Sequence, residues 1–156
     1  MLSDPRRPPL RLEAYDAEDL QSLSALAQDA VLTVADLAYA PEHRTFAAVM
    51  NRYCWERAGK GRAEAAGFRV RSGLHFGCVT RVRRRNFAAA DPGVVLSLLA
   101  ITVSDPADGG HGGGGSVIEL SFSGGAAIRL DVECVEARLS DVSAPWPAVR
   151  RPEHER

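Results

Sequence analysis

The residues in this sequence that are best suited to chemistry are arginines. The run LHFGCVTRVRRRNF ends in a strand-like stretch with four arginines within five positions. If the strand continues through Arg85, its period of two places Arg81, Arg83 and Arg85 on one face, with Phe87 beside them. Arginines spaced by about 7 Å along a strand could follow a phosphate backbone. One function to consider is therefore binding of RNA or another anionic ligand.

The charge of the whole chain argues against that reading. The net charge of the 156 residues is −1, although residues 51–85 hold ten basic side chains against two acidic ones. That segment carries +8 and the remainder −9. Nucleic-acid-binding domains usually have a net basic charge. The sequence therefore favours cross-strand pairing of these arginines with Glu119, Asp131 or Glu133 over an open basic surface.

Aromatic residues supply a second candidate surface. A strand over NRYCWE would present Asn51, Tyr53 and Trp55 on one face. That face is either buried or an aromatic contact surface for a partner protein. Trp146, near the C-terminus, is a further candidate for binding a partner.

Catalytic residues are harder to find. His75 is close in sequence to Cys78 and could form a base and nucleophile pair with it, but residues three apart on a strand point to opposite faces. Glu119 and Asp131 could form an acid–base pair, yet they alternate with apolar residues as on a solvated sheet face. A small hydrolase is the second alternative, and we assign no catalytic residue.

The sequence has no cofactor-binding or metal-binding motif in the structural context that such a motif requires. The loop GGHGGGGS over 109–116 contains G-x-G-x-x-G, but an alternating, strand-like segment follows it instead of a helix. The four histidines share no ligand spacing. Cys54, Cys78 and Cys134 are far apart and odd in number, so we expect buried free thiols in a reducing compartment. The sequence predicts no cofactor and no metal.

The elements that would position these residues are mostly strands. Asp16 predicts the start of a helix, with Asp19 in a capping-box-like position, and leucines at helical spacing continue it to about Gln28. From Ala30 onward β-branched and aromatic segments predict six or seven antiparallel strands. Residues 132–142 fit a strand or a helix, and we interpret them as a short helix.

These elements predict a β-rich α+β fold, which is a mostly antiparallel sheet or small barrel with an N-terminal and a short C-terminal helix. A pleckstrin-homology-like barrel is one form of it. Residues 1–9 are predicted to be a flexible arm, 10–147 a single globular domain and 148–156 an extended tail. The longest apolar-rich run, 94–103, is about half a membrane span. We expect a cytoplasmic protein with no membrane contact.

Most of the chain resembles one protein family. The resemblance rests on five segments, which are LRLEAYDAEDLQSLSALAQDAVLTVADLAY, FAAVMNRYCWE, LHF, VLSLLAITV and AIRLDVECVEARLSDVSAPW. The sequence resembles the uncharacterised, mainly alphaproteobacterial domain-of-unknown-function family 2948. The resemblance implies a cytoplasmic bacterial setting and one fold unit, but no mechanism. Our leading hypothesis is a non-catalytic binding or adaptor domain that acts through a protein partner or by self-association.

Overall fold

A computed structural model describes residues 8–57, 66–87, 91–105, 115–149 and 152. Its strands are β1 (Arg11–Ala14), β2 (Val31–Thr33), β3 (Leu37–Ala40), β4 (Thr45–Tyr53), β5 (Phe68–Phe76), β6 (Val79–Arg85), β7 (Val95–Ser104), β8 (Ser116–Phe122), β9 (Ala127–Val132), β10 (Ala137–Asp141) and β11 (Trp146–Pro147). Within these ranges they form one antiparallel, eleven-stranded sheet in the order β1-β10-β5-β4-β2-β7-β8-β9-β6, while β3 pairs with β4 and β11 with β5.

The α-helix α1 (Ala17–Ala27) lies where the sequence predicts it. The Asp16 carboxylate accepts a hydrogen bond of 2.8 Å from the backbone N–H of Asp19, which satisfies one free donor of the first turn. Leu20 and Leu23 are buried and repeat at helical spacing. The helix is therefore anchored at its start by a cap and along its length by one apolar face.

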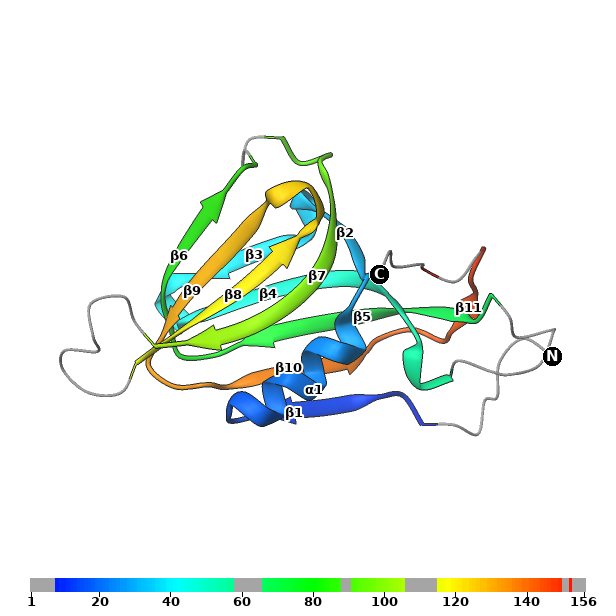
Figure 1. The fold of residues 1–156 in the computed structure, drawn as a ribbon, viewed down its shortest axis with the longest axis horizontal. Coiled ribbons are helices and arrows are strands. Elements are labelled where there is room, and N and C mark those ends of the chain that lie inside the picture. The colour runs from blue at the N-terminus through cyan, green and yellow to red at the C-terminus, as the bar shows by residue number, and fades with distance from the viewer. Residues whose placement is uncertain (1–7, 58–65, 88–90, 106–114, 150–151, 153–156) are drawn as a thin grey trace.

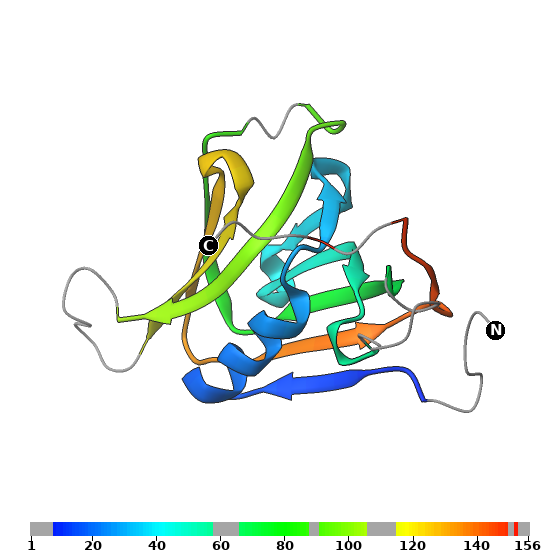
Figure 2. The ribbon, with the colours of Figure 1, turned by 45° about the vertical axis from the view of Figure 1, so that its right-hand side comes forward.

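The sheet bends so that it forms two layers (Figures 1 and 2). Strands β3, β4, β5, β10 and β1 form one layer, and β7, β8, β9 and β6 form the other. Strand β2 pairs with both β4 and β7 and so joins them. Helix α1 contacts β7, β1 and β4, and it covers the side on which the layers open. The sheet stays open, with β1 and β6 at the two ends of its strand order.

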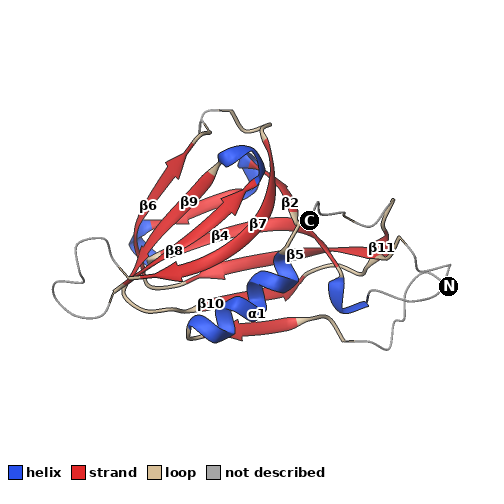
Figure 3. Cartoon of the chain, in the orientation of Figure 1, coloured by secondary structure: helices blue, strands red, loops and turns tan. Residues whose placement is uncertain are grey.

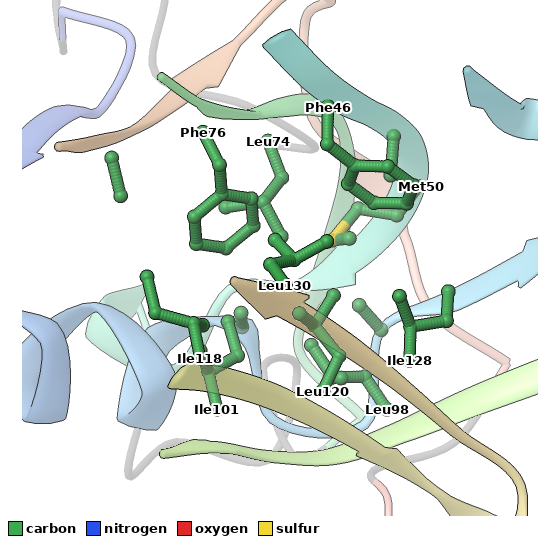
Figure 4. Packing of buried hydrophobic residues seen from close by; sticks show 14 of the residues in the cluster. Phe46, Met50, Leu74, Phe76, Leu98, Ile101, Ile118, Leu120, Ile128 and Leu130 are labelled. Atoms are coloured by element: carbon green, nitrogen blue, oxygen red, sulfur yellow. The ribbon is translucent and has the colours of Figure 1, made fainter. Parts of the chain in front are cut away.

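The core lies between the two layers (Figure 4). Every second residue of a strand points inward, and on β4, β5, β8 and β9 these residues are almost all large and apolar. They include Phe46, Met50, Leu74, Phe76, Ile118, Leu120, Ile128 and Leu130, all buried. Because the inward faces are used for the core, any binding surface on the strands must lie on their outer faces.

The predicted C-terminal helix is wrong. Over 132–142, strand β9 ends at Val132 and the chain then returns as β10, as Figure 3 shows. Leu139 of β10 lies opposite Leu12 of β1 on one side and Leu74 of β5 on the other. Strand β10 thus forms backbone hydrogen bonds on both edges. This pairing favours a strand more than the helical spacing of the apolar residues favours a helix. The strand number also exceeds the predicted six or seven, because strands of two to five residues leave little alternation to read.

Some predictions fall outside the described residues. The arm over 1–9 is described only from residue 8, and most of the glycine loop and of the tail is also undescribed. The single-domain boundaries stay a prediction. In the part of the chain that is described, no helix is long and apolar enough to span a membrane.

Candidate functional site

A row of aromatic and arginine side chains crosses three strands on the outer face of the first layer. Tyr53 of β4 lies opposite Arg69 of β5, and Arg69 lies opposite Trp146 of β11. The Arg69 guanidinium carbon is 5.8 Å from the centre of the Tyr53 ring, within cation–π range. The Trp55 ring meets the Tyr53 ring edge-on, with centroids 4.6 Å apart. The fold thus places Tyr53 and Trp146 on either side of Arg69, with Trp55 against Tyr53.

These aromatic residues differ in their exposure. The Tyr53 side chain is buried, at 1% exposure. Trp55 is not on the strand, because β4 ends at Tyr53 and Trp55 opens a short 3-10 turn, so the prediction of one shared strand face is wrong for this residue. Its indole N–H donates a 2.8 Å hydrogen bond to the carbonyl of Gln28. Trp146 keeps 37% of its surface exposed, so it is the aromatic member best placed to be contacted from outside.

Two arginines tie the row to its surroundings. Arg69 donates to the carbonyl oxygens of Asn51 (3.0 Å) and Asp29 (3.4 Å), and its partial burial lowers its pKa. Arg71 donates to the side-chain oxygen of Asn51 at 3.2 Å and lies 3.7 Å from a carboxylate oxygen of Asp36. Asn51 therefore holds both arginines in place, which is a positioning role within the scaffold.

Small side chains occupy the middle of the same face. Val49 of β4, Gly73 of β5 and Ser140 of β10 lie opposite one another, and a Cβ added to Gly73 would meet no atom within 4 Å. Val142, which is 63% exposed, lies at one end of this surface. Its backbone N–H donates to the carbonyl of Arg71, and Trp146 lies opposite Arg69, two residues away on β5. We call this surface, from Val49 through Gly73 and Ser140 to Val142 and Trp146, the outer face.

The arginine-rich strand β6 lies in the other layer, at the end of the sheet order. Arg83 donates a 2.7 Å hydrogen bond to Asp131 on β9. Arg129, directly opposite Arg83, donates at 2.9 Å to Glu119 on β8, and this hydrogen bond lowers the pKa of Glu119. Glu119 and Asp131, the two carboxylates considered as an acid–base pair, are therefore both held by arginines. Internal pairing of β6 with the C-terminal carboxylates occurs at Arg83.

The remaining arginines of β6 are open to solvent. Arg81, Arg84 and Arg85 are exposed, and among the described residues none of them forms an ion pair. Glu133, the third predicted partner, pairs instead with Arg44. Phe87 lies beyond the strand and packs against the core, so it does not extend the arginine row as predicted. The arginines of residues 51–85 are thus of three kinds in the described structure: some are buried, some form ion pairs, and some are exposed without an ion pair.

His75 and Cys78 do not form a base and nucleophile pair in the described structure, in line with the expectation that they point to opposite faces. In the described structure the Cys78 thiol lies 3.0 Å from the sulfur of Cys134 and 3.3 Å from a carboxylate oxygen of Glu136, and no hydrogen bond joins it to His75. Cys54 is buried, but Cys78 is only partly buried and Cys134 is exposed, so the prediction of buried thiols is wrong for Cys134. Cys78 and Cys134 are 56 residues apart in sequence, and only the fold brings them together.

A buried arginine was missed by the sequence reasoning. Arg52 is 0% exposed and points inward from β4. It donates two hydrogen bonds of 2.8 Å to Glu56 and two of 3.0 and 3.2 Å to Asp141, and the Ser72 hydroxyl donates to Asp141 at 2.7 Å. Burial alone would lower the pKa of Arg52, but the two carboxylates outweigh it and raise the pKa. Arg52 is in phase with the buried residues of β4, and this alternation could have shown that its side chain points inward.

Comparison with known proteins leads to a single result. The family model described as "Protein of unknown function (DUF2948)" matches residues 10–154. No curated protein and no solved structure gave a significant match. The match spans nearly the whole chain, including β1, α1, the outer face and the arginine strand. This chain belongs to the DUF2948 family.

Proposed function

We propose that this chain is a non-catalytic binding domain that docks a protein partner on its outer face, with Trp146 as the anchor. The observation that carries the proposal is the half-exposed Trp146 beside the exposed Val142, at the edge of a sheet surface of small side chains. Tryptophan is among the residues that contribute most to protein interfaces. Small neighbouring side chains allow a partner to approach the backbone closely.

The backbone that carries the anchor is paired in the sheet before any partner arrives. Trp146 pairs with Arg69 across β11 and β5, and the backbone N–H of Ala148 donates a 3.0 Å hydrogen bond to the carbonyl of Gly67. A backbone that is already ordered loses little conformational entropy on binding. The exposed Arg71 beside it favours a partner segment with acidic groups. These features support a preformed binding surface.

The test compares two exposed apolar residues on different layers. Trp146→Ala should lose the companion that wild type retains in affinity purification from its native cells, and Leu99→Ala on β7 should keep it. Titration calorimetry with the purified companion should show about 30-fold weaker binding for Trp146→Ala, since an interface hot spot is worth about 2 kcal/mol. Equal affinity of Trp146→Ala and wild type, or repeated recovery of the chain alone, would refute the proposal.

Self-association is tested in the same way. If the partner is a second copy of the chain, sedimentation equilibrium should show a concentration-dependent dimer for wild type and a monomer for Trp146→Ala. A cytoplasmic, bacterial setting belongs to the proposal, and the three free cysteines, which are typical of a reducing compartment, support its cytoplasmic part. A pleckstrin-homology-like barrel stays a prediction, and sheets of this kind host many functions.

Anionic-ligand binding is a second candidate, supported by the free arginines of β6. The outer side of the β8-β9-β6 sheet carries more basic than acidic groups: its four arginines are Arg81, Arg83, Arg85 and Arg129, and its two carboxylates are Glu119 and Asp131. Filter binding of single-stranded RNA over a salt series should give a steep slope. That slope should flatten by about one unit for each arginine–phosphate pair removed by the combined substitutions Arg81→Ala and Arg85→Ala, which leave the paired Arg83 in place. Arg11→Ala, an exposed arginine on β1, is the matched control. Absence of binding at low salt would exclude this function.

A further inference from the structure

Two cysteines and a glutamate converge where two chain reversals meet. Cys78 lies in the turn between β5 and β6, whereas Cys134 and Glu136 lie in the connection between β9 and β10. The two sulfurs are 3.0 Å apart, and the Cys78 sulfur is 3.3 Å from a carboxylate oxygen of Glu136. One ligand atom from each of the three residues lies within 4.8 Å of the other two. The cluster thus joins connections that are more than fifty residues apart in sequence.

The backbone holds this cluster in place. The N–H of Gly77 donates to the carbonyl of Glu136 at 2.9 Å, and the N–H of Glu133 donates to the carbonyl of Cys78 at 3.0 Å. Cys78 itself has a φ of 58°, a left-handed conformation that costs energy for a residue with a side chain. A Cβ at Gly77 would lie only 3.0 Å from the Glu136 carboxyl carbon. The position of the two thiols therefore follows from the backbone of both connections.

The cluster gathers groups that can all become negative. The basic residue Arg44 forms its ion pair with Glu133. Glu136 itself makes no ion pair with any residue that the structure describes. Two thiols and a carboxylate without a paired cation are the donor set expected of a cation site.

We propose that Cys78, Cys134 and Glu136 bind a thiophilic divalent cation of the zinc class, with water at the fourth position. Tetrahedral zinc, with bonds of about 2.3 Å to sulfur and 2.0 Å to oxygen, separates two sulfurs by about 3.8 Å and sulfur from oxygen by about 3.5 Å. The observed separations of 3.0 and 3.3 Å reach these values through small side-chain movements. Because Cys134 and Glu136 are exposed, the ion can enter from solvent.

Binding would change both the charge and the rigidity of the cluster. Two neutral thiols and Zn²⁺ give a zinc dithiolate and two protons, which pass to the solvent. Thiolate ligands select zinc over magnesium or calcium, which prefer oxygen. The ion would tie the β5–β6 turn to the β9–β10 connection. A disulfide between the cysteines is the competing outcome, and it makes no use of Glu136.

The test uses the reduced full-length protein and cobalt as a spectroscopic probe. Co²⁺ titration should saturate at one equivalent per chain with thiolate-to-cobalt charge-transfer absorption, and Zn²⁺ should displace the cobalt. Cys78→Ser and Cys134→Ser should abolish the signal, and Glu136→Gln should weaken binding by on the order of tenfold or more. Glu133→Gln, a neighbouring carboxylate that is paired with Arg44, should bind as wild type does. Circular dichroism checks that each variant is folded.

Three results would overturn the proposal. The first is the absence of saturable binding by the reduced wild-type protein. The second is unchanged cobalt absorption in Cys78→Ser or Cys134→Ser, which would place the ion elsewhere. The third is wild-type affinity in Glu136→Gln, which would leave a thiol pair without the carboxylate. A rise in thermal stability with zinc that is lost in Cys78→Ser gives an independent readout.

Discussion

Replacing Arg52 with methionine tests whether the buried ion cluster holds β4 and β10 together across β5. Methionine keeps much of the side-chain length but removes the guanidinium, which donates to both Glu56 and Asp141. Glu56, with a side chain 30% exposed, can turn toward water. Asp141, with a side chain only 8% exposed, cannot easily do so and would keep a buried charge without its cation.

The expected loss of stability follows from that buried charge. Removing one partner of a buried ion pair costs about 3–5 kcal/mol. For a chain of this length, that loss corresponds to a decrease in Tm of about 6–20 °C. A double variant, Arg52→Met with Asp141→Leu, removes both charges and should lose less free energy of unfolding than the single variant. The matched control is Arg129→Met on the outer side of β9, where an exposed pair is worth about 0.2–1 kcal/mol.

The assay is urea denaturation followed by tryptophan fluorescence, since Trp55 lies in the turn that also carries Glu56. The midpoints and slopes for wild type, Arg52→Met, the double variant and Arg129→Met give the free energies of unfolding. If Arg52→Met and Arg129→Met destabilise the protein by the same amount, within about 1 kcal/mol, the buried cluster does not have the role that its geometry indicates. A double variant less stable than Arg52→Met would contradict the charge argument.

Two further predictions concern the scaffold. Gly67→Ala should cost about 2–4 kcal/mol, because φ there is +74° and the new Cβ would lie 2.2 Å from the Tyr53 hydroxyl; Gly73→Ala, with open space at its Cβ, should cost under about 1 kcal/mol in the same denaturation assay. Arg129 lowers the pKa of Glu119 in the folded state, so their pair adds stability that is present at neutral pH and lost as pH falls below the ordinary glutamate value of about 4.3. The stability difference between wild type and Arg129→Met should therefore shrink in acid, and a difference that grows toward low pH would contradict this assignment.

Local sequence patterns were sufficient for the parts of the fold that depend on neighbouring residues. Asp16 and the leucines after it determine α1, because a cap and an apolar face act within a few residues. The alternation of Phe46, Ala48 and Met50 determines which face of β4 is buried. Family membership also follows from the sequence, since the match covers residues 10–154.

Strand order and register decided the rest, because they bring together residues that have no local relation. Arg52 meets Asp141 across 89 residues, and Cys78 meets Cys134 across 56. Residues Ala137–Asp141 became a strand because β1 and β5 lie on either side and hydrogen-bond to their backbone. The charge count of the chain could not separate a paired Arg83 from a free Arg81, since pairing depends on which residue of β9 lies within reach. The candidate sites on this chain therefore depend on the order and register of its strands. For a strand such as β4, local sequence patterns determine only which face is buried.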